Sequence, residues 1–310
     1  MKHSHLRNLC TSPAQLDSHA LTERINALCD TFPFLQYGIL GQSLLGAPIP
    51  LLTLGNGQHK CLYVATHHAM EWITSLLLVR FVYDFCQSAE DRAKIGAVCP
   101  ERLLHSHTLY IVPMLNPDGV DYQIHGLDKS NPIRERVLEM NSGSEDFSHW
   151  QANARGVDLN HNYDAGFAEY KAMEEEAGKN QGAPTKYSGE APESEPETAA
   201  LCNFIRLTQP LDGILSLHTQ GEEIFYEGGG TPPPRSQRIA RALSKASGYK
   251  LSRAVGSASY GGLTDWCVQQ AKIAAFTLEC GRGKNPLPHT DASEIYCRLR
   301  ELLFLFPGML

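Results

Sequence analysis

The chain has 310 residues, of which 42% are hydrophobic, and a formal net charge of −7. That is enough to bury one sizeable core, as one large α/β domain or two smaller ones, and no linker in the sequence favours two. The acidic balance without a basic stripe argues against a nucleic-acid-binding protein. The N-terminus carries no apolar signal segment, and no stretch approaches the roughly 18 apolar residues of a membrane span, so we expect a soluble, cytoplasmic protein.

Nine cysteines are scattered singly, without a CxxC pair. An odd number with no close spacing fits neither a disulfide framework nor a structural zinc knuckle. We therefore expect reduced thiols in a reducing compartment.

Hydrophobic periodicity and turn residues predict strands that alternate with helices. In chain order, the expected elements are a helix over 21–34, a hairpin over 37–54 that turns at Gly46, a strand over 61–65, a helix over 72–85, a strand over 108–113 with a turn at 116–119, a helix that starts at 194–197 and runs to 207, a strand over 213–217, a helix over 236–247, a loop over 256–262, a strand over 274–278 and a helix over 292–306. Between 120 and 191 the periodicity weakens, and a long structureless insert in a compact domain usually carries function. The alternation predicts an α/β protein with a largely parallel sheet, in which ligands bind beyond the carboxyl ends of the strands.

The tetrad His68-Ala-Met-Glu71 stands between the strand over 61–65 and the helix over 72–85. A strand end followed by the first helical turn can aim a His and a Glu three residues later at one point, and zinc accepts both ligand types at about 2.0–2.2 Å. By itself, the pair fits a surface histidine and a helix-starting glutamate at least as well. Catalytic zinc sites usually take three protein ligands, so a third is required.

Two further residues directly follow predicted strands, namely His218 and Glu279. His218 would complete a His/Glu/His ligand set, the type suited to zinc as Lewis acid and water activator, although a core histidine at a strand end is the alternative. Partial desolvation should raise the pKa of Glu279. That suits a general base that takes a proton from an activated water and passes it to a leaving amine.

From about Leu21 onward, the chain resembles the zinc carboxypeptidase family. The resemblance rests on seven motifs in the family's order, which are His68-Ala-Met-Glu71, Asn116-Pro-Asp-Gly119, the segment 156–167, Ser194-Glu-Pro-Glu197, the strand-borne His218, Gly261-Gly-Leu-Thr-Asp-Trp266 and Phe276-Thr-Leu-Glu279. It implies one catalytic domain over 21–310 after an N-terminal extension over 1–20, with a mixed, mostly parallel eight-stranded sheet between helices. It also implies one zinc ion held by His68, Glu71 and His218, and Glu279 as the general base.

One departure from the family concerns the substrate carboxylate. Members that remove C-terminal residues from proteins usually show Asn-Arg where this chain has Asn160-His161. The missing Arg clamps a free carboxylate in a bidentate way that His cannot reproduce, so action on ordinary protein tails is doubtful. Asn160 is carried over as a substrate-carboxylate ligand. Asp158 and Asp164 fit structural caps or hydrogen-bond partners of the ligands as well as they fit substrate contacts.

Two more family positions are changed. The transition-state arginine is expected after a Trp, but Trp150 is followed by Gln151, which leaves Arg155 as the candidate substitute. The usual place of the substrate-capping tyrosine is held by Ser257, and Tyr260 is the candidate for that role.

The segment 150–163 is most similar to the bacterial branch that cleaves γ-D-glutamyl-diaminopimelate bonds in cell-wall peptides. The resemblance implies a zinc peptidase acting on a small, murein-derived peptide, in keeping with recycling in the cytoplasm. Such a substrate carries a carboxylate and an amine, which would suit a site built around His161, Arg155 and the acidic pair Glu222 and Glu223. A solvated strand start is the alternative interpretation of that pair, and we favour it.

Two other functions compete. An acylamino-acid deacylase of the aspartoacylase or succinylglutamate desuccinylase type shares the HxxE, the distant His and the Glu, but the motifs at Asn116, Gly156 and Ser194 favour a peptidase. A catalytically silent zinc-binding module that recognises peptides is the second, and retention of Glu279 speaks against it, since a pure binder needs no base.

Overall fold

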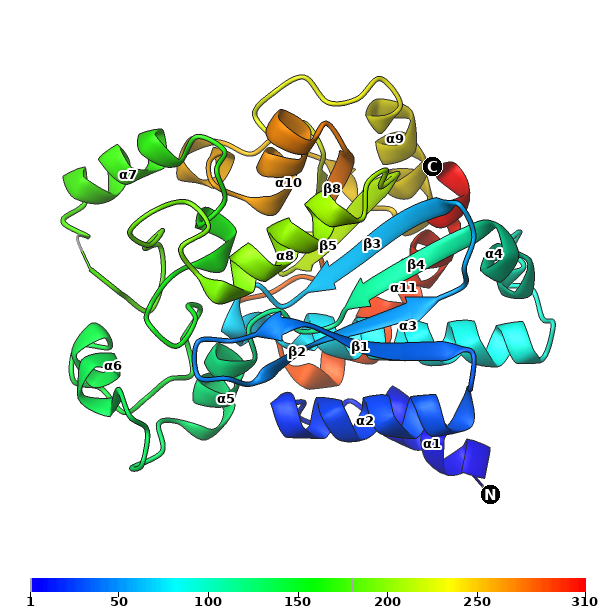
Figure 1. The fold of residues 1–310 in the computed structure, drawn as a ribbon, viewed down its shortest axis with the longest axis horizontal. Helices are drawn as coiled ribbons and strands as arrows, with labels where there is room; N and C mark the ends of the chain where they lie inside the picture. Colours follow the sequence, from blue (N-terminus) through cyan, green and yellow to red (C-terminus); the bar gives the residue numbers. More distant parts are fainter. Residues whose placement is uncertain (1, 180) are drawn as a thin grey trace.

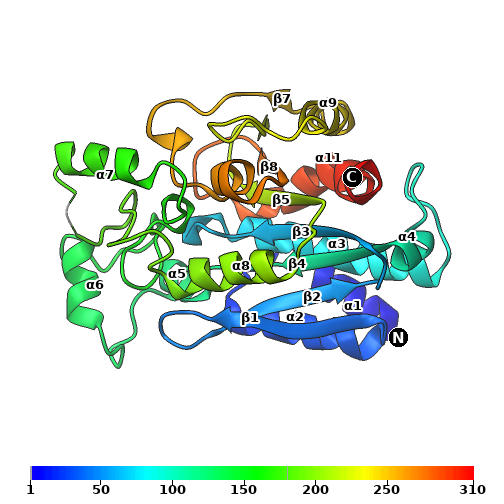
Figure 2. The same ribbon diagram turned by 45° about the horizontal axis from the view of Figure 1, so that its top comes forward.

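The structure, a computed structural model, describes residues 2–179 and 181–310 and consists of one eight-stranded sheet with helices on both faces (Figures 1 and 2). The strands are β1 (Leu35–Gln42), β2 (Pro48–Leu54), β3 (His59–Ala65), β4 (His107–Val112), β5 (Gly213–His218), β6 (Glu223–Phe225), β7 (Lys250–Leu251) and β8 (Ala274–Glu279). The helices are α1 (Lys2–Thr11), α2 (Ser18–Thr31), α3 (Ile73–Glu90), α4 (Pro100–Ser106), α5 (Pro117–His125), α6 (Arg134–Met140), α7 (Phe167–Glu176), α8 (Pro196–Leu207), α9 (Ser236–Ser247), α10 (Leu263–Trp266) and α11 (Ala292–Leu305).

The sheet has the strand order β1-β2-β4-β3-β5-β8-β6-β7. Its four central strands, β4, β3, β5 and β8, are parallel, whereas β1 and β2 form an antiparallel hairpin at one edge and β6 runs antiparallel to β8. The predicted α/β class, with a mixed and mostly parallel eight-stranded sheet, is thus confirmed. Because parallel strands end at the same edge, β3, β5 and β8 bring their last residues together.

Strand β3 shows how the core is divided between the two faces. Successive side chains of a strand point to opposite faces. Cys61, Tyr63 and Ala65 therefore pack in the cluster that includes α3, α9 and α11, while Leu62 and Val64 pack in the cluster that includes α8 and α10. Burial on both faces explains why this strand reads as a continuous apolar run.

Most predicted elements are observed with ends shifted by a few residues, but two helix starts differ from the prediction. Asn116-Pro-Asp-Gly119 is not a free turn, because Asn116 caps α5: its Oδ1 accepts the N–H of Gly119 at 3.1 Å, and Pro117 holds the first helical position. Ser194 does not cap α8. Glu195 occupies the capping position, and the Ser194 hydroxyl donates to its Oε1 at 2.7 Å.

The stretch between 120 and 191 is not a structureless insert, contrary to the sequence prediction. It contains the end of α5, the helices α6 and α7, and a short 3₁₀ turn over Leu159–His161. Its apolar side chains form a cluster of their own, which includes Tyr122, Val137, Phe147 and Trp150. Figure 1 places α6 and α7 at the left, beyond the ends of the central strands. The segment is therefore packed, and it can hold side chains against the sheet edge.

The first twenty residues also contribute to the core, since Leu6, Cys10 and Leu16 are buried in the cluster that contains α2 and α3. All nine cysteines carry free thiols. Over the described residues, no helix has both the length and the apolar character needed to cross a membrane.

Candidate metal centre and active site

Three predicted ligands converge at the carboxyl edge of the sheet. His68 lies just beyond β3, Glu71 ends the 3₁₀ turn Ala69–Glu71, and His218 is the last residue of β5. One ligand atom from each lies within 4.8 Å of the other two. His68 Nδ1 is 3.0 Å from Glu71 Oε1, and His218 Nδ1 is 3.2 Å from Glu71 Oε2. Glu71 enters from a 3₁₀ turn, and α3 begins only at Ile73, after the metal motif.

The electrostatics of this cluster call for a positive charge at its centre. His68 Nδ1 and His218 Nδ1 are 3.3 Å apart, and two imidazole nitrogens so close repel unless a proton or a cation lies between them. Burial lowers the pKa of His68, but Glu71 and Asp158 outweigh it and hold that pKa well above its usual value. Burial raises the pKa of Glu71, yet His68 and His218 bring it down to about 2. Two imidazoles and a carboxylate around one point are a donor set that fits zinc.

A second layer of hydrogen bonds orients His68. The Nε2–H of His68 donates to Asp158 Oδ1 at 3.0 Å, which directs Nδ1 at the centre of the cluster. Gln151 donates to the other carboxylate oxygen at 3.0 Å, and the N–H of Lys186 does so at 3.3 Å. Burial alone would raise the pKa of Asp158, but His68 and His161 lower it below its usual value. Gln151 therefore supports the predicted ligand His68 through Asp158, at the position where the family pattern led us to expect an arginine.

Glu71 is held by two groups that the sequence analysis did not single out. The N–H of Thr219 donates to Oε2 at 3.2 Å, and Asn285 donates to Oε1 at 3.4 Å. Asn285 also donates to the Thr219 carbonyl at 2.9 Å and accepts from the Thr219 hydroxyl at 2.8 Å. Asn285 lies in a Gly- and Pro-rich loop after β8, and its type and spacing give no signal of this contact.

Glu279 stands beside the ligands because His218 and Glu279 are paired across β5 and β8. Burial, and then the negative charge of Glu71, raise the pKa of Glu279 to about 8, although His68 opposes the shift. A carboxyl group with such a pKa exchanges protons near neutral pH, as a general base must.

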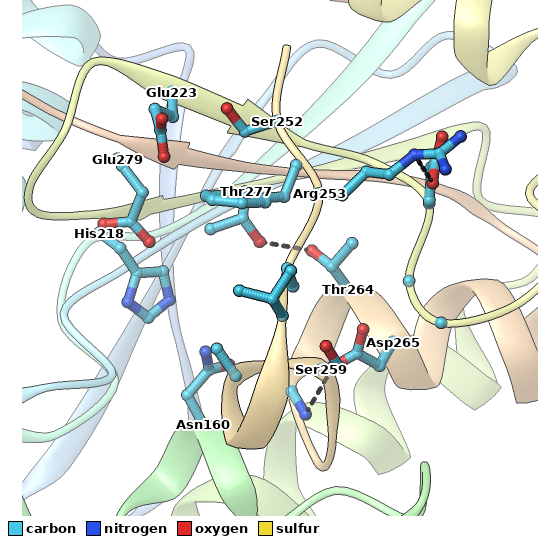
Figure 3. Close-up of a pocket in the computed structure, with 18 of the residues that line it drawn as sticks. Asn160, His218, Glu223, Ser252, Arg253, Ser259, Thr264, Asp265, Thr277 and Glu279 are labelled. Carbon is cyan, nitrogen blue, oxygen red and sulfur yellow. Dashed lines mark hydrogen bonds and ion pairs between the residues drawn. The ribbon is translucent and has the colours of Figure 1, made fainter. Parts of the chain in front are cut away.

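These side chains line a cavity of about 650 Å³, shown in Figure 3. The carboxylates that line it belong to Glu71, Glu223, Glu227, Asp265 and Glu279. Among the described residues, Arg253 is the only lysine or arginine in its lining, and it is paired with Glu227 at 2.8 Å. The cavity is large enough for a short peptide and favours a ligand with a positively charged group.

Asn160 and His161 both line the cavity. The side-chain oxygen of Asn160 accepts the N–H of Leu263 at 3.1 Å, so its amide nitrogen is the group left for a ligand. His161 is fixed by its surroundings: Nδ1–H donates to the Tyr260 carbonyl at 2.8 Å, and the ring stacks on Tyr170 with centroids 3.9 Å apart. Burial lowers the pKa of His161, so the ring is uncharged at neutral pH.

The structure does not bring the side chains of Arg155 and Tyr260 to this cavity. Arg155 pairs with Glu195 at 2.8 Å, donates to the Ser194 carbonyl at 2.9 Å, and lines a separate hollow of about 180 Å³. The Tyr260 ring packs over Gly166, where a Cβ atom would lie 2.5 Å from its Cδ1. Both side chains therefore have local structural partners.

The acidic pair Glu222 and Glu223 is divided between two environments. Glu222 is 7% exposed and pairs with Arg282 at 2.7 Å and with Arg298 at 2.6 Å. Glu223 begins β6 and lines the cavity. Glu222 is therefore not a solvated strand start, which was the interpretation that we favoured for the pair, whereas Glu223 does begin a strand and is half-exposed at the cavity wall.

Comparison with known proteins identifies relatives over most of the chain. Residues 21–301 match the family model described as zinc carboxypeptidase. The chain is 34% identical over 280 residues to gamma-D-glutamyl-L-diamino acid endopeptidase 1 of Lysinibacillus sphaericus, over 90% of this chain and 69% of that protein. The structure is similar to thrombin activatable fibrinolysis inhibitor, with a TM-score of 0.71 and 18% identity over 98% of this chain and 80% of that one. It is also similar to murein-tripeptide amidase MpaA from Escherichia coli O157, with a TM-score of 0.51 and 22% identity over 86% and 91%.

The fold and these relatives define a hydrolase of the peptidase class. The chain belongs to the zinc carboxypeptidase family. The resemblance inferred from the seven motifs is thereby confirmed, and so is the similarity to a γ-D-glutamyl-diamino acid peptidase. The solved structures are under 25% identical to this chain and support the fold alone.

Proposed function

We propose that this protein is a zinc-dependent peptidase that hydrolyses the γ-D-glutamyl-diaminopimelate amide bond in a small peptide, with Glu279 as the general base. The observation that carries the proposal is the pairing of His218 with Glu279 across neighbouring strands, beside His68 and Glu71. That arrangement sets a proton-accepting carboxylate next to a His/Glu/His donor set at the wall of an open cavity.

In this proposal, one zinc ion is held by His68, Glu71 and His218, where it would polarise the substrate carbonyl and lower the pKa of water. Glu279 takes a proton from the attacking water and passes it to the leaving amine nitrogen, so the same carboxyl group acts first as base and then as acid. Asn160 directs its amide N–H toward the substrate, and His161 shapes the wall beside it.

The choice of substrate rests on charge. The family's arginine, which clamps the C-terminal carboxylate of a protein substrate, is replaced by the neutral His161, so the carboxylates of a diaminopimelate peptide would be left to the amide N–H of Asn160. The charged side chains of the lining are mostly carboxylates, which suits a peptide that carries an amine, as a diamino acid does. The relative from Lysinibacillus sphaericus, named for a γ-D-glutamyl-diamino acid bond, supports the same choice. Recycling of murein-derived peptides in the cytoplasm stays a prediction from the sequence.

The test is hydrolysis of L-Ala-γ-D-Glu-meso-diaminopimelate by the purified, zinc-loaded protein, beside a hippuryl-type carboxypeptidase substrate. Products are identified by mass spectrometry, with and without a chelator. We expect chelator-sensitive cleavage of the γ-glutamyl bond. Cleavage of only the hippuryl substrate would refute the assigned bond, and cleavage of neither substrate would refute the proposed function.

The variant Glu279→Gln tests the mechanism. Removal of the base should lower kcat by about 10²–10⁴-fold while bound zinc stays near one ion per chain, because Glu279 is not a ligand in this proposal. Metal content is measured by mass spectrometry of the dialysed protein. Loss of metal in this variant would show that Glu279 holds the ion, and unchanged kcat would show that it is not the base.

A further inference from the structure

Glu223 and Glu279 set two carboxyl groups opposite each other on the wall of the cavity. The antiparallel register of β6 and β8 places Glu223 opposite Glu279 and Phe225 opposite Thr277. Because every second side chain of a strand points to the same face of the sheet, these four residues line the same cavity. Figure 3 shows the carboxyl groups of Glu223 and Glu279 next to each other, near His218. Opposed carboxylates destabilise a sheet, so this arrangement has a cost.

In the described part of the chain no lysine or arginine forms an ion pair with Glu223, although the register of β6 and β7 sets Lys250 opposite it on its other side. Within residues 2–179 and 181–310, its carboxylate has no hydrogen bond or ion pair, whereas Glu222 pairs with Arg282 and Arg298, and Glu227 pairs with Arg253. Glu279 is assigned to the reaction and Glu71 to the metal. Glu223 is thus a carboxylate at the cavity wall with neither a structural partner nor a catalytic task.

We propose that Glu223 is a specificity-determining residue, which binds a primary ammonium group on the substrate residue next to the scissile amide. The inference rests on the proposed function and adds the residue that binds the side-chain amine of the diamino acid. Directly opposed side chains have Cβ atoms about 4.5–5.5 Å apart, so an ammonium at Glu223 lies within one residue's reach of Glu279. The salt bridge formed on binding satisfies a carboxylate that is otherwise unpaired.

Asp265 is the rival for this role, since it also faces the cavity and has no basic partner among the described residues. Its Oδ2, however, accepts the N–H of Gly262 at 3.1 Å, a contact that closes the start of α10. Asp265 therefore has a structural task that Glu223 lacks.

The test compares γ-D-glutamyl-L-lysine with γ-D-glutamyl-L-norleucine, which has the same carbon chain without the amine. The zinc-loaded protein should prefer the lysine peptide in kcat/KM by about tenfold or more. Glu223→Gln should bring that ratio toward one, mainly through KM for the lysine peptide, and Glu223→Lys should reverse it. The exposed Glu301→Gln is the matched control and should leave the ratio unchanged.

Three outcomes would overturn the proposal. Equal losses on both peptides, with a shift of the pH profile, would mean that Glu223 acts on Glu279. Loss of the preference in Asp265→Asn but not in Glu223→Gln would assign the ammonium to Asp265. Equal kcat/KM values of the parent protein for the lysine and norleucine peptides would show that the side-chain ammonium is not recognised.

A binding measurement separates this proposal from the proposed function. Calorimetry with zinc-loaded Glu279→Gln compares free lysine with norleucine as ligands, and the measurement is repeated in the double variant that adds Glu223→Gln. Selective binding of lysine that disappears in the double variant supports the role of Glu223 even if the parent cleaves neither peptide. Equal binding of the two amino acids to Glu279→Gln would refute it.

Discussion

The hydrogen bond from His68 to Asp158 should control zinc affinity, and Asp158→Asn tests it. The Asp158 carboxylate is fully buried and accepts from His68, from Gln151 and from the N–H of Lys186. An asparagine of the same size keeps only one acceptor atom, so it cannot satisfy these donors together. It also loses the charge that stabilises the His68 ring with Nδ1 turned to the metal.

Loss of such a partner of a metal-bound histidine typically costs 10–100-fold in metal affinity. Converted to free energy, that is about 1.4–2.7 kcal/mol of zinc binding. The full effect is expected here, because the carboxylate is shielded from water and no exposed group can replace it. The measurement is a zinc titration of the apoprotein in competition with a chromophoric chelator, followed by kcat at saturating zinc.

Asp164→Asn is the control, since Asp164 is an exposed carboxylate in the same segment and lies outside the metal cluster. It should bind zinc as the parent does. A zinc Kd for Asp158→Asn within twofold of the parent value would refute the reasoning, because it would mean that packing alone orients His68.

Two further predictions concern specificity and pH. His161→Arg should place a cation in the cavity and raise kcat/KM for hippuryl-type substrates relative to kcat/KM for the γ-glutamyl peptide. The variant should also be less stable, because it loses the ring stacking of His161 on Tyr170. An unchanged ratio of the two kcat/KM values would show that His161 does not face the substrate. Burial, followed by Asp118 and Glu195, raises the pKa of Glu197 from 4.5 to about 7, so the folded state keeps a proton that the unfolded chain loses. Its contribution to stability is complete below about pH 4.5 and is lost as the pH rises to about 7, by at most about 3 kcal/mol. Urea unfolding at pH 5 and pH 8 should show a smaller drop for Glu197→Gln than for the parent, and equal drops would contradict this account.

The central strands could be predicted from the sequence because their signal is local. A strand buried on both faces must be mostly apolar, and the central residues of β3, β5 and β8 are so composed. Residues directly after such strands must then meet at one edge of a parallel sheet, which is why His68, His218 and Glu279 could be selected by their positions in the sequence. Helix starts were less certain, since Asn116 and Ser194 are both plausible caps and only Asn116 makes the capping contact.

The surroundings of the site were decided by tertiary structure alone. Arg155 and Tyr260 lie close in sequence to cavity residues, but their side chains have other partners. In the packed segment around α6 and α7, Arg155 forms an ion pair with Glu195, and the ring of Tyr260 lies over Gly166. Asn285 contacts Glu71 across 214 residues of chain, a separation at which residue type carries no positional information.

The adjacent residues Glu222 and Glu223 also show that the sequence does not predict the partners of a side chain. The sequence alone determined that two adjacent carboxylates stand at the start of a possible strand. The pleat of β6 and the position of α11 then decided that Glu222 lies against Arg298 while Glu223 lines the cavity. Strand alternation is a property of the backbone and can be predicted, whereas the partner found on each face depends on segments that are distant in the chain.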